Sequence, residues 1–286
     1  MPRHRTTARA ILPLLAGACV AAGPAAADLP PPGGIPNASG IVFPVVGPAQ
    51  YYDDFGEPRA GGRHQANDIV APKRALAVAA EDGKVKLWTA SKSAGCMLYL
   101  YGRSGTTYLY IHLNNDLTKG NDNRGKCVAG TAYAKGLRSG ATVRAGQPIG
   151  FVGDSGDADG IHAHLHFEVH PNGGKAVSPF PYLKRARRLL YAAAPWSLVS
   201  LTLVGKVVAA SDGELRLAVD TLRASTGLRI AKVGLTVTLA LPPEAPAASI
   251  PVARGKTVTV STLPTATTLD TELAKPRALT VDTSSL

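Results

Sequence analysis

One ten-residue segment, IHAHLHFEVH at residues 161–170, constrains the fold more than any other part of the chain. Its apolar and polar residues alternate with a period of two, which is the pattern of a half-buried β-strand. As a strand, the segment has an apolar face made of Ala163, Leu165, Phe167 and Val169. Its other face carries His162, His164, His166, Glu168 and His170. Side chains two positions apart on one face lie about 7 Å from each other, so neighbouring imidazoles can serve one site.

Similar short runs fill the rest of the chain. From residue 41 to residue 183 they include GKVKLW, TTYLYIHL and HLHFEV, separated by turns rich in glycine. They predict a mainly β fold with an antiparallel sheet. Residues 184–195 look like a connector with one or two helical turns. Residues 196–286 repeat the strand pattern without histidine or cysteine, and we expect them to form a small β barrel or sandwich of unknown role.

The N-terminal residues have the pattern of an export signal. Residues 1–27 contain three arginines, then an apolar run, then the small residues AAA. This order predicts a signal peptide cleaved after Ala27, followed by a Pro- and Gly-rich lead-in over residues 28–40. An uncleaved membrane anchor and lipidation at Cys19 are the alternatives. We therefore expect a secreted or extracytoplasmic protein in the cell wall or periplasm.

Charge and cysteine content agree with export. Cleavage after Ala27 lowers the formal net charge from +11 to +8, and a basic exported chain favours contact with anionic wall polymers over nucleic acid. The basic run KRARR at residues 184–188 is interpreted as a solvated face. Cleavage also leaves two cysteines, Cys96 and Cys127, and two cysteines in an exported chain predict a disulfide. It would hold the polar loop at residues 114–141 to the strand that contains Cys96.

Two more segments carry groups that bind metals. His64 and Asp68 stand four apart in GRHQANDIVAP, and His112 lies in TTYLYIHL, where alternation places it on the same face as Tyr108 and Tyr110. Taken singly, each of these segments has an ordinary structural explanation. Together, two histidines and a carboxylate suit a catalytic zinc ion with a fourth position for water. Zinc lowers the pKa of that water, and further histidines can accept its proton or stabilise an oxyanion.

The order H-x-x-x-D, Y-x-H-L and H-L-H-F-E-V resembles the LytM/lysostaphin-type peptidoglycan metalloendopeptidases of peptidase family M23. The resemblance covers about residues 42–183. It extends to FPVVGPAQYYDDFGEPR before the first motif, EDGKV after it and VRAGQPIGFVGDSG before the last. It implies a β-rich domain whose narrow groove receives an extended wall peptide. The implied reaction is hydrolysis of a peptide bond in the stem or cross-bridge of peptidoglycan.

The resemblance also implies roles for five residues. His64, Asp68 and His166 would be the ligands of one zinc ion. His164 would be the general base, and His112 would hold the water or stabilise the oxyanion. All five positions are intact in this chain, which favours an active hydrolase over two alternatives. These are a non-catalytic wall-binding or amidase-activating protein on the same fold, and a surface protein that only buffers metal.

Three positions depart from the pattern or add to it. Ala66 stands where the first motif usually has glycine, and alanine would be strained there if the backbone required a positive φ. His162 is an additional imidazole, which we expect at the rim of the site. His170, at the end of the strand, is expected to be structural or exposed.

Overall fold

The computed structural model describes residues 40–189, 191–193, 197–211, 213–241, 254–266 and 278–282. The expected signal peptide and residues 28–39 of the lead-in lie outside the described residues. Most of the proline-rich stretch at residues 241–251 also lies outside them. No helix within the described residues is long and apolar enough to cross a membrane.

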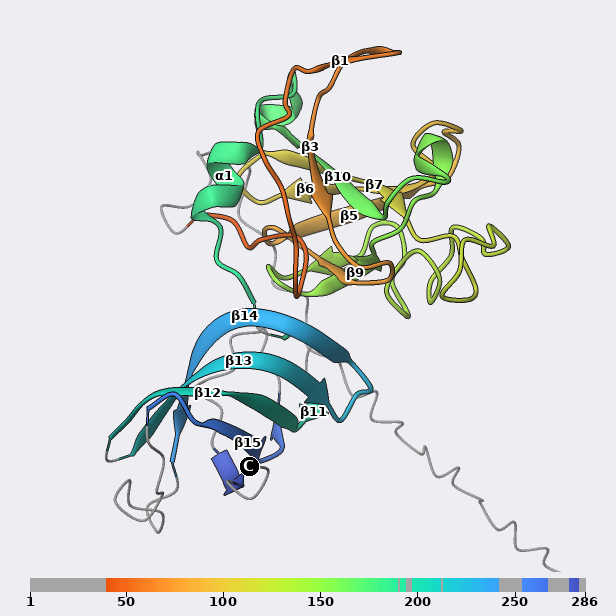
Figure 1. The fold of residues 1–286 in the computed structure, drawn as a ribbon. Coiled ribbons are helices and arrows are strands. Elements are labelled where there is room, and N and C mark those ends of the chain that lie inside the picture. Colours follow the sequence, from red (N-terminus) through yellow and green to blue (C-terminus); the bar gives the residue numbers. More distant parts are fainter. Residues whose placement is uncertain are drawn as a thin grey trace, which may run out of the picture. The chain divides into compact units, whose positions relative to one another are not determined.

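The first half of the described chain is built on a six-stranded sheet, and all of its strand pairs are antiparallel (Figure 1). In spatial order its strands are β3 (Asn67–Val70), β10 (His164–His170), β7 (Thr107–Leu113), β6 (Cys96–Gly102), β5 (Gly83–Trp88) and β8 (Thr142–Val143). Two smaller ribbons accompany it. These are β1 (Pro58–Arg59) with β2 (Gly62–Arg63), and β4 (Leu76–Val78) with β9 (Pro148–Phe151). The predicted mainly β, antiparallel fold is confirmed.

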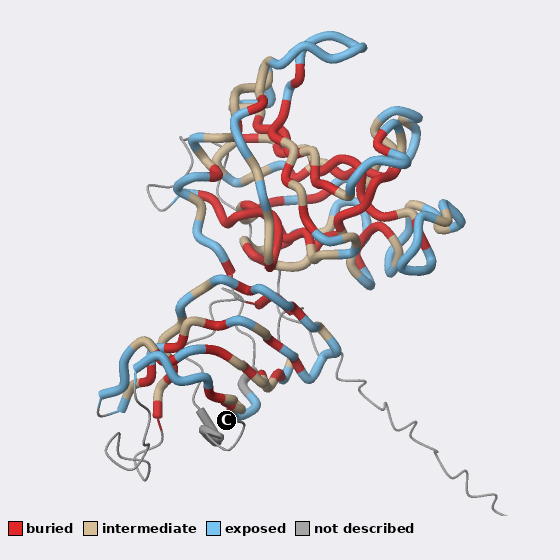
Figure 2. The backbone as a smooth tube through the Cα atoms, in the orientation of Figure 1, coloured by how far each residue is buried: buried red, intermediate tan, exposed pale blue. Residues whose placement is uncertain are grey.

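Alternation along the strands separates a core face from an outer face. Leu165, Phe167 and Val169 of β10 are fully buried, as predicted, and pack with apolar residues of β5, β6 and β7. Figure 2 shows this buried interior along the strands, with the β1–β2 hairpin exposed. The outer face of β10 carries His164, His166 and Glu168. The period-two pattern therefore fixes which side of the sheet can hold a polar site.

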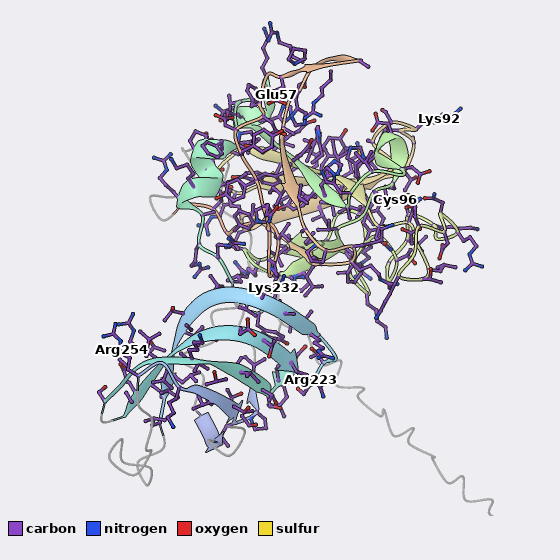
Figure 3. The ribbon with its side chains drawn as sticks, in the orientation of Figure 1. Glu57, Lys92, Cys96, Arg223, Lys232 and Arg254 are labelled. Atoms are coloured by element: carbon purple, nitrogen blue, oxygen red, sulfur yellow. A yellow bond between two sulfur atoms is a disulfide. The ribbon has the colours of Figure 1, made fainter. Side chains whose placement is uncertain are left out.

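The polar loop that follows β7 is fastened at two points. The predicted disulfide between Cys96 and Cys127 is present and joins the loop to β6 (Figure 3). In addition, the Lys73 ammonium lies 2.7 Å from a carboxylate oxygen of Asp116 and 2.7 Å from one of Asp154. We call these three residues the lysine clip. Since both acids are buried, the clip ties the loop to the turn after β9.

Helices are few and short among the described residues. They are η1 (Gly156–Ala158), η2 (Pro171–Gly173) and α1 (Phe180–Arg185). The helical turn expected within the connector begins earlier than predicted, at Phe180, and ends at Arg185. Pro181 in the first turn suits a helix start, because its missing N–H has no partner to lose there.

The C-terminal half is a second antiparallel β region. Its five-stranded sheet has the order β14 (Arg229–Ala240), β13 (Glu214–Ala224), β12 (Leu201–Ser211), β15 (Thr257–Thr262) and β17 (Ala278–Asp282). A ribbon of β11 (Leu198–Val199) and β16 (Thr265–Ala266) accompanies it. A hairpin joins β12 to β13, because Ser211 pairs with Glu214 and Gly213 has a φ of 80°. A positive φ costs glycine little, which explains its place in the turn.

Candidate metal and catalytic site

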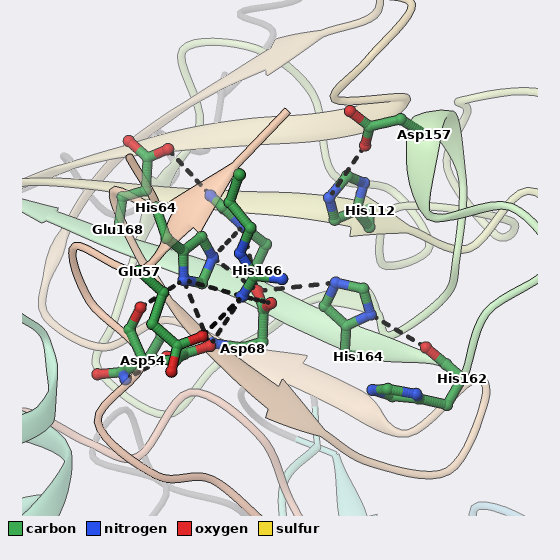
Figure 4. Close-up of polar contacts among 12 residues, drawn as sticks. Asp54, Glu57, His64, Asp68, His112, Asp157, His162, His164, His166 and Glu168 are labelled. Carbon is green, nitrogen blue, oxygen red and sulfur yellow. Dashed lines mark hydrogen bonds and ion pairs between the residues drawn. The ribbon is translucent and has the colours of Figure 1, made fainter. Parts of the chain in front are cut away.

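The site forms where β3 pairs with β10. His166 lies directly opposite Asp68 in the antiparallel register, although the two are 98 residues apart in the sequence. His64 follows β2, and its side chain is buried against the same two residues. Backbone pairing thus brings together the three residues that the sequence assigned to the metal (Figure 4).

The three donor atoms form a nearly equilateral triangle. His64 Nε2 lies 3.1 Å from Asp68 Oδ1 and 3.1 Å from His166 Nδ1, and His166 Nδ1 lies 3.1 Å from Asp68 Oδ1. Ligands about 2.1 Å from a tetrahedral zinc ion would lie about 3.4 Å from one another. Two imidazole nitrogens and one carboxylate oxygen with this spacing fit zinc and leave room for a fourth ligand.

The two ligand histidines are oriented by acceptors behind them. His64 Nδ1 lies 3.0 Å from the carbonyl oxygen of Asp54, and His166 Nε2 lies 3.2 Å from Glu168 Oε1. Both partners accept hydrogen bonds, so each of these nitrogens carries its ring's hydrogen. When the rings are neutral, the opposite nitrogens, His64 Nε2 and His166 Nδ1, present lone pairs to the centre. Such outer hydrogen bonds commonly set the tautomer and orientation of metal ligands.

The same rule applies to the two histidines assigned to catalysis. His164 Nδ1 donates to the carbonyl oxygen of His162 at 3.0 Å, and His112 Nδ1 donates to that of Ser155 at 2.8 Å. Each ring therefore keeps an unprotonated Nε2. His164 Nε2 faces the centre, 3.7 Å from Asp68 Oδ1, and the His112 ring centroid lies 5.1 Å from that of His164. The structure brings all five predicted residues into one cluster.

The predicted face of His112 was wrong. Strict alternation places it with Tyr108 and Tyr110, and both tyrosines are fully buried in the core. Instead His112 has a φ of 61°, which turns its side chain out of the alternating pattern and toward His164 and His166. A left-handed backbone is unfavourable for a residue with a Cβ atom and is found most often at functional sites.

The four imidazoles of the site fall into two classes by the direction in which their surroundings shift the pKa. Burial alone would lower the pKa of His64, but its hydrogen bonds to Asp54 and Asp68 outweigh burial and raise it to about 10. Burial and the neighbouring His164 and His166 lower the pKa of His112 to about 4. Burial likewise lowers the pKa of His164. In the absence of an ion His64 therefore carries a proton that a bound metal ion would displace, whereas His112 and His164 are neutral acceptors near pH 7.

Several residues of the cluster were not assigned a role from the sequence. Asp54 is buried and accepts a hydrogen bond from Asn67 at 2.7 Å, which fixes the carboxylate behind His64. Arg59 extends from β1 to within 3.2 Å of Asp68 Oδ2, the oxygen outside the triangle. Both residues lie in the segment YYDDFGEPR. The segment as a whole resembles the family, but no spacing within it identifies either residue as part of the site.

Beyond Glu168, the network continues to a residue expected to be structural or exposed. His170 Nε2 lies 2.6 Å from Glu168 Oε2, and His170 Nδ1 lies 2.9 Å from the carbonyl oxygen of Gly174. His170 therefore holds the acid that orients His166. His162 is exposed, with its ring centroid 5.7 Å from that of His164, as expected for a rim position.

Ala66 causes no backbone strain of the kind considered from the sequence. It is fully buried, and its φ is not among the positive values found for described residues other than glycine. The condition under which alanine would loosen the site is therefore not met.

Part of the chain, including the site, is similar to known proteins. Residues 62–179 match peptidase family M23. The L-Ala--D-Glu endopeptidase of Bacillus subtilis is 26% identical over 160 residues, which cover 52% of this chain and 44% of that protein. The chain thus spans less than half the length of this relative.

Solved structures of similar proteins were also found. A putative glycyl-glycine endopeptidase lytM from Ruminococcus gnavus is 22% identical, with a TM-score of 0.42, over 54% of this chain and 64% of that one. The catalytic domain of lysostaphin from Staphylococcus simulans is 25% identical, with a TM-score of 0.37, over 48% of this chain and 92% of that one.

Proposed function

We propose that this chain is an exported zinc-dependent endopeptidase of peptidase family M23 that cuts peptide bonds in bacterial peptidoglycan, and the match of residues 62–179 to that family supports the proposal. The observation that carries the proposal is the ligand triangle of His64, Asp68 and His166, flanked by two neutral histidines. We assign residues 41–183 to the peptidase domain, 184–195 to a connector and 196–286 to a separate β domain.

Zinc, when bound by His64, Asp68 and His166, lowers the pKa of a water molecule and polarises the substrate carbonyl. The protein supplies the proton transfer. His164 presents an unprotonated Nε2 to the centre and is the group that accepts the proton of the attacking water. Its low pKa keeps it in the accepting form near neutral pH.

His112 is better suited to holding the water than to stabilising the oxyanion. Its Nδ1 hydrogen is committed to the Ser155 carbonyl, so its Nε2 can accept a hydrogen bond but cannot donate one while the ring is neutral. A pKa of about 4 keeps the ring neutral. We therefore assign His112 to orienting the water toward the scissile carbonyl.

The substrate class is supported by the relative and by the export pattern. The Bacillus subtilis relative is named for a bond between L-Ala and D-Glu, a bond found in peptidoglycan stems. The N-terminal pattern of residues 1–27 and the disulfide both suit an extracytoplasmic protein. The basic net charge would favour contact with anionic wall polymers.

The test is digestion of purified peptidoglycan sacculi by the zinc-loaded protein, with released fragments identified by mass spectrometry. New peptide termini that appear with the wild type and not with His164→Ala would support the proposal and identify the bond. No release from several wall types, with one zinc bound per chain, would overturn it in favour of a binding or activating role.

A further inference from the structure

The outer face of the sheet continues beyond the site. Through the antiparallel register, Glu168 of β10 pairs with Leu109 of β7, and Leu109 pairs with Tyr99 of β6. Tyr99 in turn pairs with Lys86 of β5. Paired residues point to the same side of a sheet, so these side chains share the face that carries His166.

An aromatic and basic cluster occupies this extension. We call Lys86, Trp88, Tyr99 and Tyr101 the aromatic platform. The Tyr99 and Tyr101 rings are stacked, with centroids 6.1 Å apart, and Trp88 meets Tyr99 edge to face at 6.4 Å. The Lys86 ammonium lies 4.9 Å from the Trp88 ring centroid and 5.7 Å from that of Tyr99. Contacts of this kind hold the rings in place.

The platform is open and positively charged. Tyr101 is 44% exposed, which is unusual for a large aromatic side chain, and Lys84 and Lys86 are both exposed. Neither lysine forms an ion pair with any residue in the described part of the chain. The core side of the same strands carries its own buried residues, Val85, Leu98 and Leu100, so the rings lie outside the core. Exposed rings beside unpaired cations suit a ligand with apolar ring faces and acidic or carbonyl oxygens.

We propose that the aromatic platform binds the glycan strand of peptidoglycan beside the peptide that the site cuts. This inference rests on the proposed function. Sugar rings present C–H faces that pack on aromatic rings, and their acetamido and carboxylate oxygens can accept hydrogen bonds from the lysines. The wall polymer is anionic, which matches the charge of the platform. The platform also shares the sheet face of the site, so one polymer can contact both.

The distances agree with such a joint contact. Tyr99 and Tyr101 lie two strands from β10, level with Glu168 and His170, so they are about 12 Å and about 17 Å from His166 at ordinary strand geometry. Four or five residues of extended peptide span about 13 to 18 Å. The sugar that bears the stem peptide would thus reach the platform when the cut bond lies four or five residues from that sugar.

The test measures binding separately from hydrolysis. Glycan strands freed of their peptides, which the site cannot cut, would be titrated into the purified zinc-loaded protein, and binding would be followed by calorimetry. We expect Tyr101→Ala to weaken binding about tenfold, whereas Tyr101→Phe, which keeps the ring, retains it. Lys86→Ala is expected to weaken binding and Lys86→Arg to preserve it. Leu198→Ala, at another exposed apolar side chain, is the matched control.

Hydrolysis assays complete the test. For Tyr101→Ala, the rate on intact sacculi should fall at least fivefold more than the rate on a soluble stem peptide. Equal losses on both substrates, or glycan binding that Tyr101→Ala and Lys86→Ala leave unchanged, would overturn the inference. Glycan binding by a wild type that cuts no wall peptide would overturn the proposed function and leave this inference standing. A wild type that cuts wall peptides but does not bind glycan would overturn this inference and leave the proposed function standing.

Discussion

The metal site and the lysine clip are both clusters of charge with buried members, yet they are built in opposite ways. In the clip, Lys73 provides the cation for Asp116 and Asp154, and Asp116 also accepts hydrogen bonds from the backbone of Asp122 and Asn123. In the site, lone pairs of two imidazoles and a carboxylate converge on one point. A cluster that contains its own cation fastens the chain, whereas one whose donors converge is prepared for an added cation.

The largest expected effect comes from removing a donor at the convergent cluster. Asp68→Ala should lower zinc affinity by at least about a thousandfold and abolish hydrolysis, because it removes one of three ligands. Zinc titration against a competing chelator measures this. Lys73→Met is the informative comparison, since it should leave zinc stoichiometry at one per chain. Loss of zinc in both variants would contradict the distinction between the clusters.

Breaking the lysine clip should mainly cost stability. Lys73→Met leaves two buried carboxylates without their cation, and removal of one partner from a buried ion pair costs roughly 3–5 kcal/mol. Urea unfolding measures the change. Lys119→Met, at an exposed lysine of the same loop, is the control and should change stability by less than about 0.5 kcal/mol. Equal effects of the two variants would show that the clip fastens nothing.

The disulfide provides a covalent comparison for the same loop. It closes a segment with a sequence separation of 31, for which loop-closure entropy predicts roughly 3–4 kcal/mol of stabilisation. The double variant Cys96→Ala/Cys127→Ala should lose about that amount in urea unfolding while still binding zinc. A loss of zinc affinity in this variant would mean that the loop shapes the ligand triangle and does not act on stability alone.

A smaller effect is expected behind the metal ligands. Glu168→Leu removes the acceptor of His166 Nε2 and should lower zinc affinity about 10- to 100-fold, the usual cost of losing an outer hydrogen bond. Glu168→Gln keeps an acceptor oxygen and should lose less. Zinc affinities of the two variants, measured with the same chelator, check this. Identical losses would assign Glu168 a packing role instead of an orienting one.

The smallest expected effect is on the stability of the fold at low pH. Burial alone would raise the pKa of Asp116, but hydrogen bonds from Lys73 and the backbone outweigh it and lower the pKa below the ordinary 3.8. The lowered pKa stabilises the fold above pH 3.8, and this contribution is lost as the pH falls through the folded value. Unfolding free energies between pH 5 and pH 2.5 should fall less steeply for Lys73→Met than for the wild type. If the unfolding free energies of both proteins fall equally steeply, the clip is not the cause of the loss of stability in acid.

Much of the metal site was predictable because its elements are local patterns. The alternation in residues 161–170 gave the two faces of β10, and the resemblance assigned His64, Asp68 and His166, which the structure brings together. The disulfide followed from having two cysteines in an exported chain. These inferences need only strand periodicity and the preferences of metals and thiols.

Other features depend on the backbone at one position. His112 reaches the site through a φ of 61°, and no alternation pattern contains that rotation, so its predicted face was wrong. The starting point of α1 was also missed, since the expected helical turn in the connector overlaps the helix only at Lys184 and Arg185. Deviations from regular geometry are decided by the surrounding packing, which outweighs the local preference.

By itself, the sequence determined the fold class, the polar face of β10 and the disulfide, and its resemblance to a family proposed the five residues of the candidate site. Only the tertiary structure decided which groups stand behind those residues, and it alone revealed the lysine clip and the aromatic platform. The physical reason is the distance in sequence over which each feature is set. Side-chain alternation is set by neighbours in the chain, whereas the partners of Asp54, Lys73 and Tyr99 depend on the register of strands and the closure of loops far apart in sequence.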